Sequence, residues 1–226
     1  MLVSELPQVR TCAVTLTLEE ASIAAMDGRP LIQAACARFT PGVTALIGPN
    51  GAGKSTLLRA IATLHPVAQG SIALGTLESG RDRHAYLERL MFLPQNFATY
   101  PELTGQEFLE YSLQLRGAGL REARRMAGAW LEAVGLRHAA KTSTGAYSQG
   151  MRQRLGFAYA MQVDVPLYLL DEPFAGVDPE SRQTLTDLLF RICDDRIAIV
   201  STHHVDDLME RGAAVARLTS GTLVTE

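Results

Sequence analysis

The stretch Gly48–Thr56 places the strongest constraint on what this chain can fold into. It has the spacing G-x-x-x-x-G-K-S/T and lies between an apolar run, 43–47, and a run of helical character, 55–64. Glycines let successive backbone N–H groups turn inward, and the following helix adds the positive end of its dipole. The stretch therefore predicts a nest for a polyphosphate, built from Asn50, Gly51, Gly53, Lys54, Ser55 and Thr56.

Two side chains of this stretch carry the expected chemistry. Lys54 is expected to reach the β- and γ-phosphates of a nucleotide, and the Ser55 hydroxyl to ligate Mg²⁺. The alternative is a glycine-rich turn that only joins a strand to a helix. That alternative would require glycine, lysine and serine to occupy these places by accident.

Composition sets the broad class of protein. The chain has 226 residues, of which 47% are apolar and 20% charged, as in an ordinary globular protein with a sizeable core. Its formal net charge of −3 gives no general attraction to nucleic acid. Cys12, Cys36 and Cys193 form no C-x-x-C pair, which favours reduced thiols. No apolar run approaches the roughly 18 to 20 residues of a membrane span, so any span is expected from another chain.

The periodicity changes twice along the chain. Alternation over 12–39 predicts short antiparallel strands, and residues from about 104 to 161 follow a helical period that includes Phe108, Tyr111 and Leu115. Strand and helix alternation returns from 165 onward. These patterns predict an α/β fold with a mostly parallel central sheet and an N-terminal antiparallel β subdomain. We expect one domain, 1–226, with a helical subdomain inserted at about 96–161.

A second candidate site follows an apolar run, 167–170, that ends in Asp171 and Glu172. Charges at the end of a buried strand lie where the ligand crevice of a parallel sheet is found. Asp171 is therefore expected to hold Mg²⁺, directly or through water, and Glu172 to polarise an attacking water. The alternative is that the two carboxylates simply begin a solvated loop.

With these motifs in order, the chain resembles the nucleotide-binding subunit of an ATP-binding cassette (ABC) transporter over about 16–224. After the phosphate loop come Gln95 and a signature-like segment, 147–154. The Asp171–Glu172 strand end, the segment 175–178 and Thr202–His203 follow. Its compact length resembles the bacterial export type. The resemblance implies a P-loop NTPase fold and a Mg²⁺-dependent ATPase.

The resemblance also implies that ATP lies between two subunits. Ser148 and Gly150 would contact the γ-phosphate bound by a partner subunit, and Asp178 would couple the two sites. From the residues alone, Ser148 also fits an ordinary helix N-cap. The resemblance makes Gln95 a hinge residue that touches Mg²⁺ or the attacking water. Without the resemblance, the more common interpretation of an isolated glutamine after a strand is a surface amide. It makes His203, rather than its neighbour His204, the side chain that hydrogen-bonds the γ-phosphate.

Two positions depart from the family pattern. Met26 stands where an aromatic residue usually stacks on adenine, so we expect weaker stacking on the base. Gln149 stands where the signature usually has the first of two glycines, and Met151 where it has a glutamine. Because Ser148 and Gly150 remain, the signature is expected to function.

The sequence thus predicts an ATP-binding and ATP-hydrolysing subunit that powers transport through a separate transmembrane permease. It would act as a homodimer or heterodimer of ATPase subunits, peripheral on the cytoplasmic face of the cell membrane, with no nucleic-acid partner. One alternative is a soluble ABC-type ATPase that acts on ribosomes or DNA. Another is a degenerate module that binds nucleotide without hydrolysis, against which Lys54, Asp171, Glu172 and His203 argue.

Overall fold

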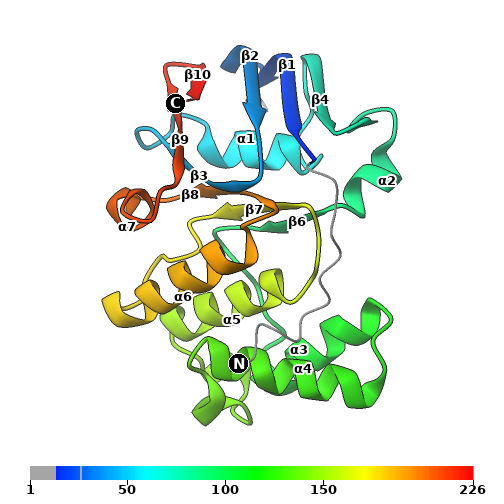
Figure 1. The fold of residues 1–226 in the computed structure, drawn as a ribbon, viewed down its shortest axis with the longest axis vertical. Coiled ribbons are helices and arrows are strands. Elements are labelled where there is room, and N and C mark those ends of the chain that lie inside the picture. Colours follow the sequence, from blue (N-terminus) through cyan, green and yellow to red (C-terminus); the bar gives the residue numbers. More distant parts are fainter. Residues whose placement is uncertain (1–13, 26, 226) are drawn as a thin grey trace. The chain divides into compact units, whose positions relative to one another are not determined.

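The structure is a computed structural model that describes residues 14–25 and 27–225 (Figure 1). These residues form two compact units. The unit that we call the α/β unit contains the described residues of 14–94, 165–172 and 189–225. The unit that we call the helical unit contains 95–164 and 173–188. The expected domain limits, 1–226 with an insertion at about 96–161, stay a prediction.

One sheet of the α/β unit is antiparallel, with the strand order β2-β1-β4-β5. Its strands are β1 (Leu16–Ala24), β2 (Pro30–Phe39), β4 (Gln69–Leu74) and β5 (Leu77–Glu78). Along β1, Leu16, Leu18, Ala21 and Ile23 are buried, and a register shift between Leu18 and Ala21 restores the inward alternation. The predicted N-terminal antiparallel strands are confirmed, although β1 and β2 have 9 and 10 residues and are not short.

The second sheet of this unit has the order β10-β9-β3-β8-β7-β6, and all its neighbours pair in parallel except β9 and β10. Its strands are β3 (Gly42–Ile47), β6 (Leu90–Leu93), β7 (Leu167–Asp171), β8 (Ile197–Ser201), β9 (Ala214–Thr219) and β10 (Thr222–Thr225). Every residue of β7 and β8 is buried, as expected of central parallel strands. The predicted mostly parallel sheet is confirmed.

The register of this sheet positions the polar residues. Ser201, the last residue of β8, pairs with Leu46 of β3 on one side and with Asp171 of β7 on the other. The carboxyl ends of three central strands therefore meet at one edge. In open α/β sheets this edge carries the ligand crevice.

Three helices lie wholly in the α/β unit: α1 (Lys54–Ile61), α2 (Arg83–Leu87) and α7 (Val205–Met209). The apolar side of α1 is buried in the core of the unit, with Leu57, Leu58 and Ile61 below 1% exposure. The helix ends three residues before the predicted limit at Leu64. Thr63 adopts a left-handed conformation there, and Leu64 N–H donates back to Arg59 O at 2.8 Å.

The helical unit contains α3 (Gly105–Leu115), α4 (Leu120–Ala133), α5 (Gln149–Met161) and α6 (Pro179–Ile192) up to Leu188. Two short 3₁₀ turns, η2 (Arg137–Ala139) and η3 (Thr144–Ala146), lie between α4 and α5. Thr104 and Glu107 form a reciprocal capping box that fixes the start of α3. No helix in residues 14–25 and 27–225 has the length and apolar character needed to cross a bilayer.

Only some of the apolar residues predicted to form one face of α3 are buried in the core. Phe108, Leu109 and Leu113 are buried, whereas Tyr111 is 45% and Leu115 69% exposed. The helical period alone does not separate a buried face from an exposed apolar one. On α3 the exposed members line a groove, described below.

Candidate functional site

The phosphate-loop stretch connects β3 to α1 and has the backbone shape that the motif predicts. Gly51 and Gly53 have φ values of 77° and 102°, in the left-handed region that favours glycine. Gly53 is the N-cap residue of α1 and offers no side chain to cap the helix. The first N–H groups of α1 therefore remain available to an anion.

Lys54 is buried against the loop that precedes it. Its Nζ donates to Gly48 O at 2.8 Å and to Pro49 O at 3.3 Å, and the residue is 9% exposed. An ammonium group held by two carbonyl oxygens sits inside the curl of the loop. A phosphate in that curl would meet a cation already in place.

Gly48 is required for a different reason, the close approach of β9. A Cβ atom at Gly48 would lie 2.1 Å from Leu218 O. Because Leu218 O belongs to the backbone of β9, it cannot move aside as the tip of a side chain can, so no larger residue fits at position 48. The loop is thus fixed at its first residue by the neighbouring strand.

A chain of hydrogen bonds joins the loop helix to β7 and β8. Ser55 Oγ donates to Asp171 Oδ1 at 3.0 Å, and Ser201 Oγ donates to the same oxygen at 2.6 Å. Asp171 is 4% exposed. Hydroxyl and carboxylate oxygens are the ligands that Mg²⁺ accepts when substrate phosphates complete its shell. Among the residues described, no group of three or more His, Cys, Asp or Glu could hold a metal ion by itself.

Glu172 and His203 face each other beside this chain of hydrogen bonds. Glu172 Oε1 lies 3.2 Å from His203 Nε2, with the carboxylate side chain 10% and the imidazole 59% exposed. Glu172 has a left-handed φ of 50°, and its N–H donates to both O and Oγ of Ser201 at 3.1 and 3.0 Å. A non-glycine residue in this conformation is held there by its surroundings.

Ser201 is the residue of this site that sequence patterns did not reveal. Its hydroxyl donates to Asp171 and accepts from Glu172 N–H, so one buried group orients both carboxylate residues. The sequence signal that could have identified Ser201 is its position, since it is the polar residue that ends the apolar strand β8.

We predict that Ser201→Ala lowers the free energy of unfolding by about 1 to 3 kcal/mol, because it leaves a buried carboxylate oxygen and a buried N–H with fewer partners. Chemical denaturation measures this loss. Ser201→Thr retains the hydroxyl and is the matched control. Equal stability of Ser201→Ala and the wild type would contradict the assigned hydrogen bonds.

The helical unit holds the remaining predicted residues. Ser148 is the N-cap of α5, and its Oγ accepts from Met151 N–H at 3.2 Å. Gly150 is needed for close packing, since a Cβ atom there would lie 2.7 Å from Gly176 O. Asp178 Oδ1 accepts from Ser181 N–H at 2.9 Å, and hydrogen bonds from Ser181 hold the pKa of Asp178 below its usual range. Gln95, the first described residue of this unit, is exposed.

The other residues named from the sequence are not part of the contacts described above. His65 Nε2 lies 2.6 Å from Ala24 O, which fits a structural role. Cys36 is an exposed free thiol and Cys193 a buried one. Met26, the expected adenine position, and Cys12 lie outside the described residues.

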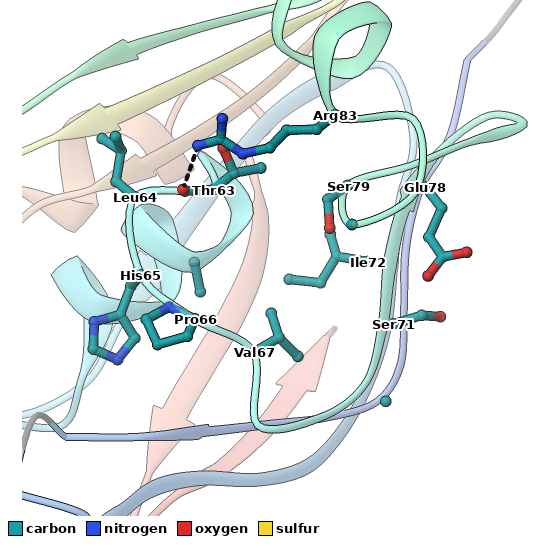
Figure 2. Close-up of a pocket in the computed structure, with 13 residues that line it drawn as sticks. Thr63, Leu64, His65, Pro66, Val67, Ser71, Ile72, Glu78, Ser79 and Arg83 are labelled. Atoms are coloured by element: carbon teal, nitrogen blue, oxygen red, sulfur yellow. Dashed lines mark hydrogen bonds between the residues drawn. The ribbon is translucent and has the colours of Figure 1, made fainter.

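A separate cavity of about 510 Å³ lies at the end of α1 (Figure 2). Arg83 reaches across it and donates to the backbone oxygen of Thr63 at 3.2 Å. Thr63 has a left-handed φ of 58°, and within the described part of the chain its buried Oγ1 has no hydrogen-bond partner. Thr63 is thus strained in its backbone and unsatisfied in its side chain.

We predict that Thr63→Gly raises the free energy of unfolding by about 1 kcal/mol, because glycine adopts the left-handed C-terminal position of a helix without strain. The bond from Arg83 goes to the backbone and is retained. Thr76→Gly, at an exposed turn residue without a positive φ, is the control and should lower stability. A decrease in the midpoint of chemical denaturation for Thr63→Gly would show that the threonine side chain contributes more than its strain costs.

The fold and the connected loop, Asp171 and Ser201 define a P-loop NTPase. Residues 39–175 match the family described as ABC transporter, and the chain belongs to that family. It is also similar in structure to a solved chain described as the ATP-binding subunit of an ABC transporter. That similarity has a TM-score of 0.81 at 24% identity and covers 93% of this chain and 89% of the other. The fold class predicted from the sequence is confirmed.

Curated relatives agree with this family. The chain is 34% identical over 197 residues to human retinal-specific phospholipid-transporting ATPase ABCA4, which covers 87% of this chain. It is 33% identical over 165 residues to the linearmycin resistance ATP-binding protein LnrL of Bacillus subtilis (strain 168), which covers 73%. The matches span 9% of ABCA4 and 53% of LnrL. The soluble ribosome- or DNA-acting alternative is not favoured by these names.

Proposed function

We propose that this chain binds and hydrolyses ATP and thereby powers transport through a separate transmembrane partner. The observation that carries the proposal is the set of contacts that links Ser55 through Asp171 and Ser201 to Glu172 and His203, beside the loop that holds Lys54. In the proposed function, these side chains would supply a cation for the phosphates, oxygens for the metal and a carboxylate base. Phosphoryl transfer to water uses functional groups of these three kinds.

The phosphate loop would bind the triphosphate. Backbone N–H groups at Asn50, Gly51 and Gly53 and at the start of α1 would face the phosphates, with Thr56 in the first turn. Lys54 Nζ would exchange its carbonyl partners for phosphate oxygens. When bound, Mg²⁺ would neutralise charge on the phosphates, held by Ser55 and Asp171 with Gln95 as a further candidate ligand.

Glu172 would act as the base that polarises water for attack on the γ-phosphate. His203, 3.2 Å from that carboxylate, would hold the γ-phosphate or orient the water. The sheet edge fixes Glu172 through two hydrogen bonds from its N–H to Ser201. A base held in this way needs little reorganisation at the moment of reaction.

A second subunit would complete each site. The N-terminus of α5, with Ser148 and Gly150, would meet the γ-phosphate bound by the partner, and Asp178 would couple the two sites. ATP binding would then close a dimer, and hydrolysis would reopen it. The chain would work at the cytoplasmic face of the membrane in a homodimer or heterodimer.

An aromatic groove of the helical unit is our candidate for the surface that docks the membrane partner. It has a volume of about 480 Å³ and lies between the segment after Gln95, α3 and α5. Tyr100 and Tyr111 in this groove are 56% and 45% exposed, which is unusual for large side chains. The other aromatic residues that line it are Phe97, Phe108 and Tyr159.

We predict that Tyr111→Asp abolishes copurification of a transmembrane protein with this chain from detergent-solubilised membranes, because a charge would enter the apolar contact. The isolated chain should hydrolyse ATP unchanged. Leu120→Asp is the matched control, since Leu120 is 74% exposed on the same unit and does not line the groove. Equal recovery of the membrane protein with Tyr111→Asp and with Leu120→Asp would rule out the groove as the docking surface.

A further inference from the structure

The side chain of Gln149 has a definite place in the helical unit, at the position where the family signature has a glycine. A Cβ atom at Gly176 would lie 3.4, 3.5 and 3.6 Å from Cδ, Cγ and Nε2 of Gln149. The glutamine therefore covers the open face of Gly176. No hydrogen bond of the described residues involves its carboxamide, so this contact is one of packing.

The segment that contains Gly176, residues 173–178, is packed on α5 at two further points. The ring of Phe174 lies 6.2 Å from that of Phe157, centroid to centroid. The carbonyl oxygen of Gly176 lies so close to Gly150 that only glycine fits there. We call residues 173–178 the Gly176 turn. Gln149 and Gly150, the first two residues of α5, thus contact different parts of the same glycine.

The Gly176 turn leads directly into α6. Val177 N–H donates to Phe174 O at 3.1 Å, and Asp178 accepts from Ser181 N–H in the first turn of the helix. Gly176 itself has a left-handed φ of 71° and no side chain to hold it. Besides its bonds within α6, the position of Asp178 therefore depends on the contacts that hold Gly176 in place.

We propose that Gln149 is a positioning residue that transmits the contact between α5 and the partner's ATP to Asp178. The inference rests on the proposed function, in which Ser148 and Gly150 meet that ATP. A shift of the first turn of α5 would move the Gln149 side chain, and the covered Gly176 turn would follow it. With glycine at position 149, this mechanical link would be missing.

The test is a double-mutant cycle of Gln149→Ala and Asp178→Ala, read as kcat and KM of ATP hydrolysis by the purified chain. Gln149→Ala should lower kcat roughly fivefold, the size of effect common for coupled residues, with little change in KM. KM should change little because the chain's own phosphate loop binds the ATP. In the Asp178→Ala background, Gln149→Ala should have no further effect.

Two variants separate packing by the Gln149 side chain from hydrogen bonding by its carboxamide and from a general loss of stability. Gln149→Met keeps an unbranched side chain of similar length and should retain wild-type kcat, because packing makes the link. Gln114→Ala, at an exposed glutamine of α3, is the control for a glutamine lost from the same unit. A thermal midpoint of Gln149→Ala equal to that of the wild type would exclude loss of folding as the cause.

Other outcomes would overturn the proposal. An equal loss of kcat in Gln149→Met would assign the effect to the carboxamide itself, and an unchanged kcat in Gln149→Ala would remove any role. An undiminished effect of Gln149→Ala in the Asp178→Ala background would show that the two residues act independently. If the wild type hydrolyses no more ATP than Glu172→Gln, the proposed function fails, which is a different result.

Discussion

Glu172→Gln is expected to lower the rate of ATP hydrolysis by about two to three orders of magnitude, the contribution usual for a positioned general base. The amide keeps the shape of the carboxylate but cannot accept a proton from water. Because glutamine leaves Lys54 and Ser55 in place, ATP should still bind. A closed dimer that binds ATP without hydrolysing it should therefore accumulate.

Two measurements check this expectation on the same preparation. Phosphate release gives the turnover, and light scattering after gel filtration in ATP gives the mass of the complex. Glu122→Gln, at an exposed residue in the first turn of α4, is the control and should behave as the wild type. Unchanged turnover in Glu172→Gln would remove Glu172 from the role of base.

Lys54→Ala is expected to weaken ATP binding by about ten- to a hundredfold. Charge-assisted hydrogen bonds are each worth about 1.5 to 3 kcal/mol, and Lys54 would make at least one such bond to a phosphate. The loss should appear first in the dissociation constant, since the lysine is buried in the loop that binds the phosphates. The rate of ATP hydrolysis would also fall, because less ATP would be bound.

Titration with a fluorescent ATP analogue measures this effect. The variant also removes two hydrogen bonds from Lys54 to loop carbonyls, so its stability should be measured alongside. Lys141→Ala, at an exposed lysine of the helical unit, is the matched control. Binding of ATP by Lys54→Ala with wild-type affinity would show that the loop does not hold the phosphates as proposed.

Much of the α/β unit could be predicted from the sequence because local signals and tertiary contacts agree there. The apolar runs that became β3, β7 and β8 are continuous, and parallel central strands are buried on both faces. The glycine spacing of the loop likewise fixes a backbone shape that few other sequences could adopt. The Asp171–Glu172 strand end and Lys54 followed from these elements.

The role of Ser201 could not be predicted, because it depends on strand register. A serine at the end of an apolar run is locally unremarkable. It becomes important only because β8 lies beside β7 with Ser201 opposite Asp171. Pairing partners and register are set by the whole sheet, which a single segment does not encode.

Three further features also depended on long-range packing. The last two strands, β9 and the edge strand β10, were not predicted, since their pairing partners set them. Tyr111 continues the helical period of α3 but faces a groove instead of the core. The departure at Gln149 was visible in the sequence, but its contact with Gly176 depends on how residues 173–178 return to α5.

The specific activity of ATP hydrolysis, measured against the concentration of the purified chain with Mg²⁺, tests the central claim most directly. If each ATP is shared between the phosphate loop of one subunit and Ser148 and Gly150 of another, phosphate release per chain should rise with concentration until dimers are saturated. Glu172→Gln should release almost no phosphate at any concentration. A specific activity of the wild type that does not change with concentration would contradict the sharing of each ATP between two subunits. Phosphate release absent from the wild type, or equal in the two proteins, would contradict hydrolysis with Glu172 as the base.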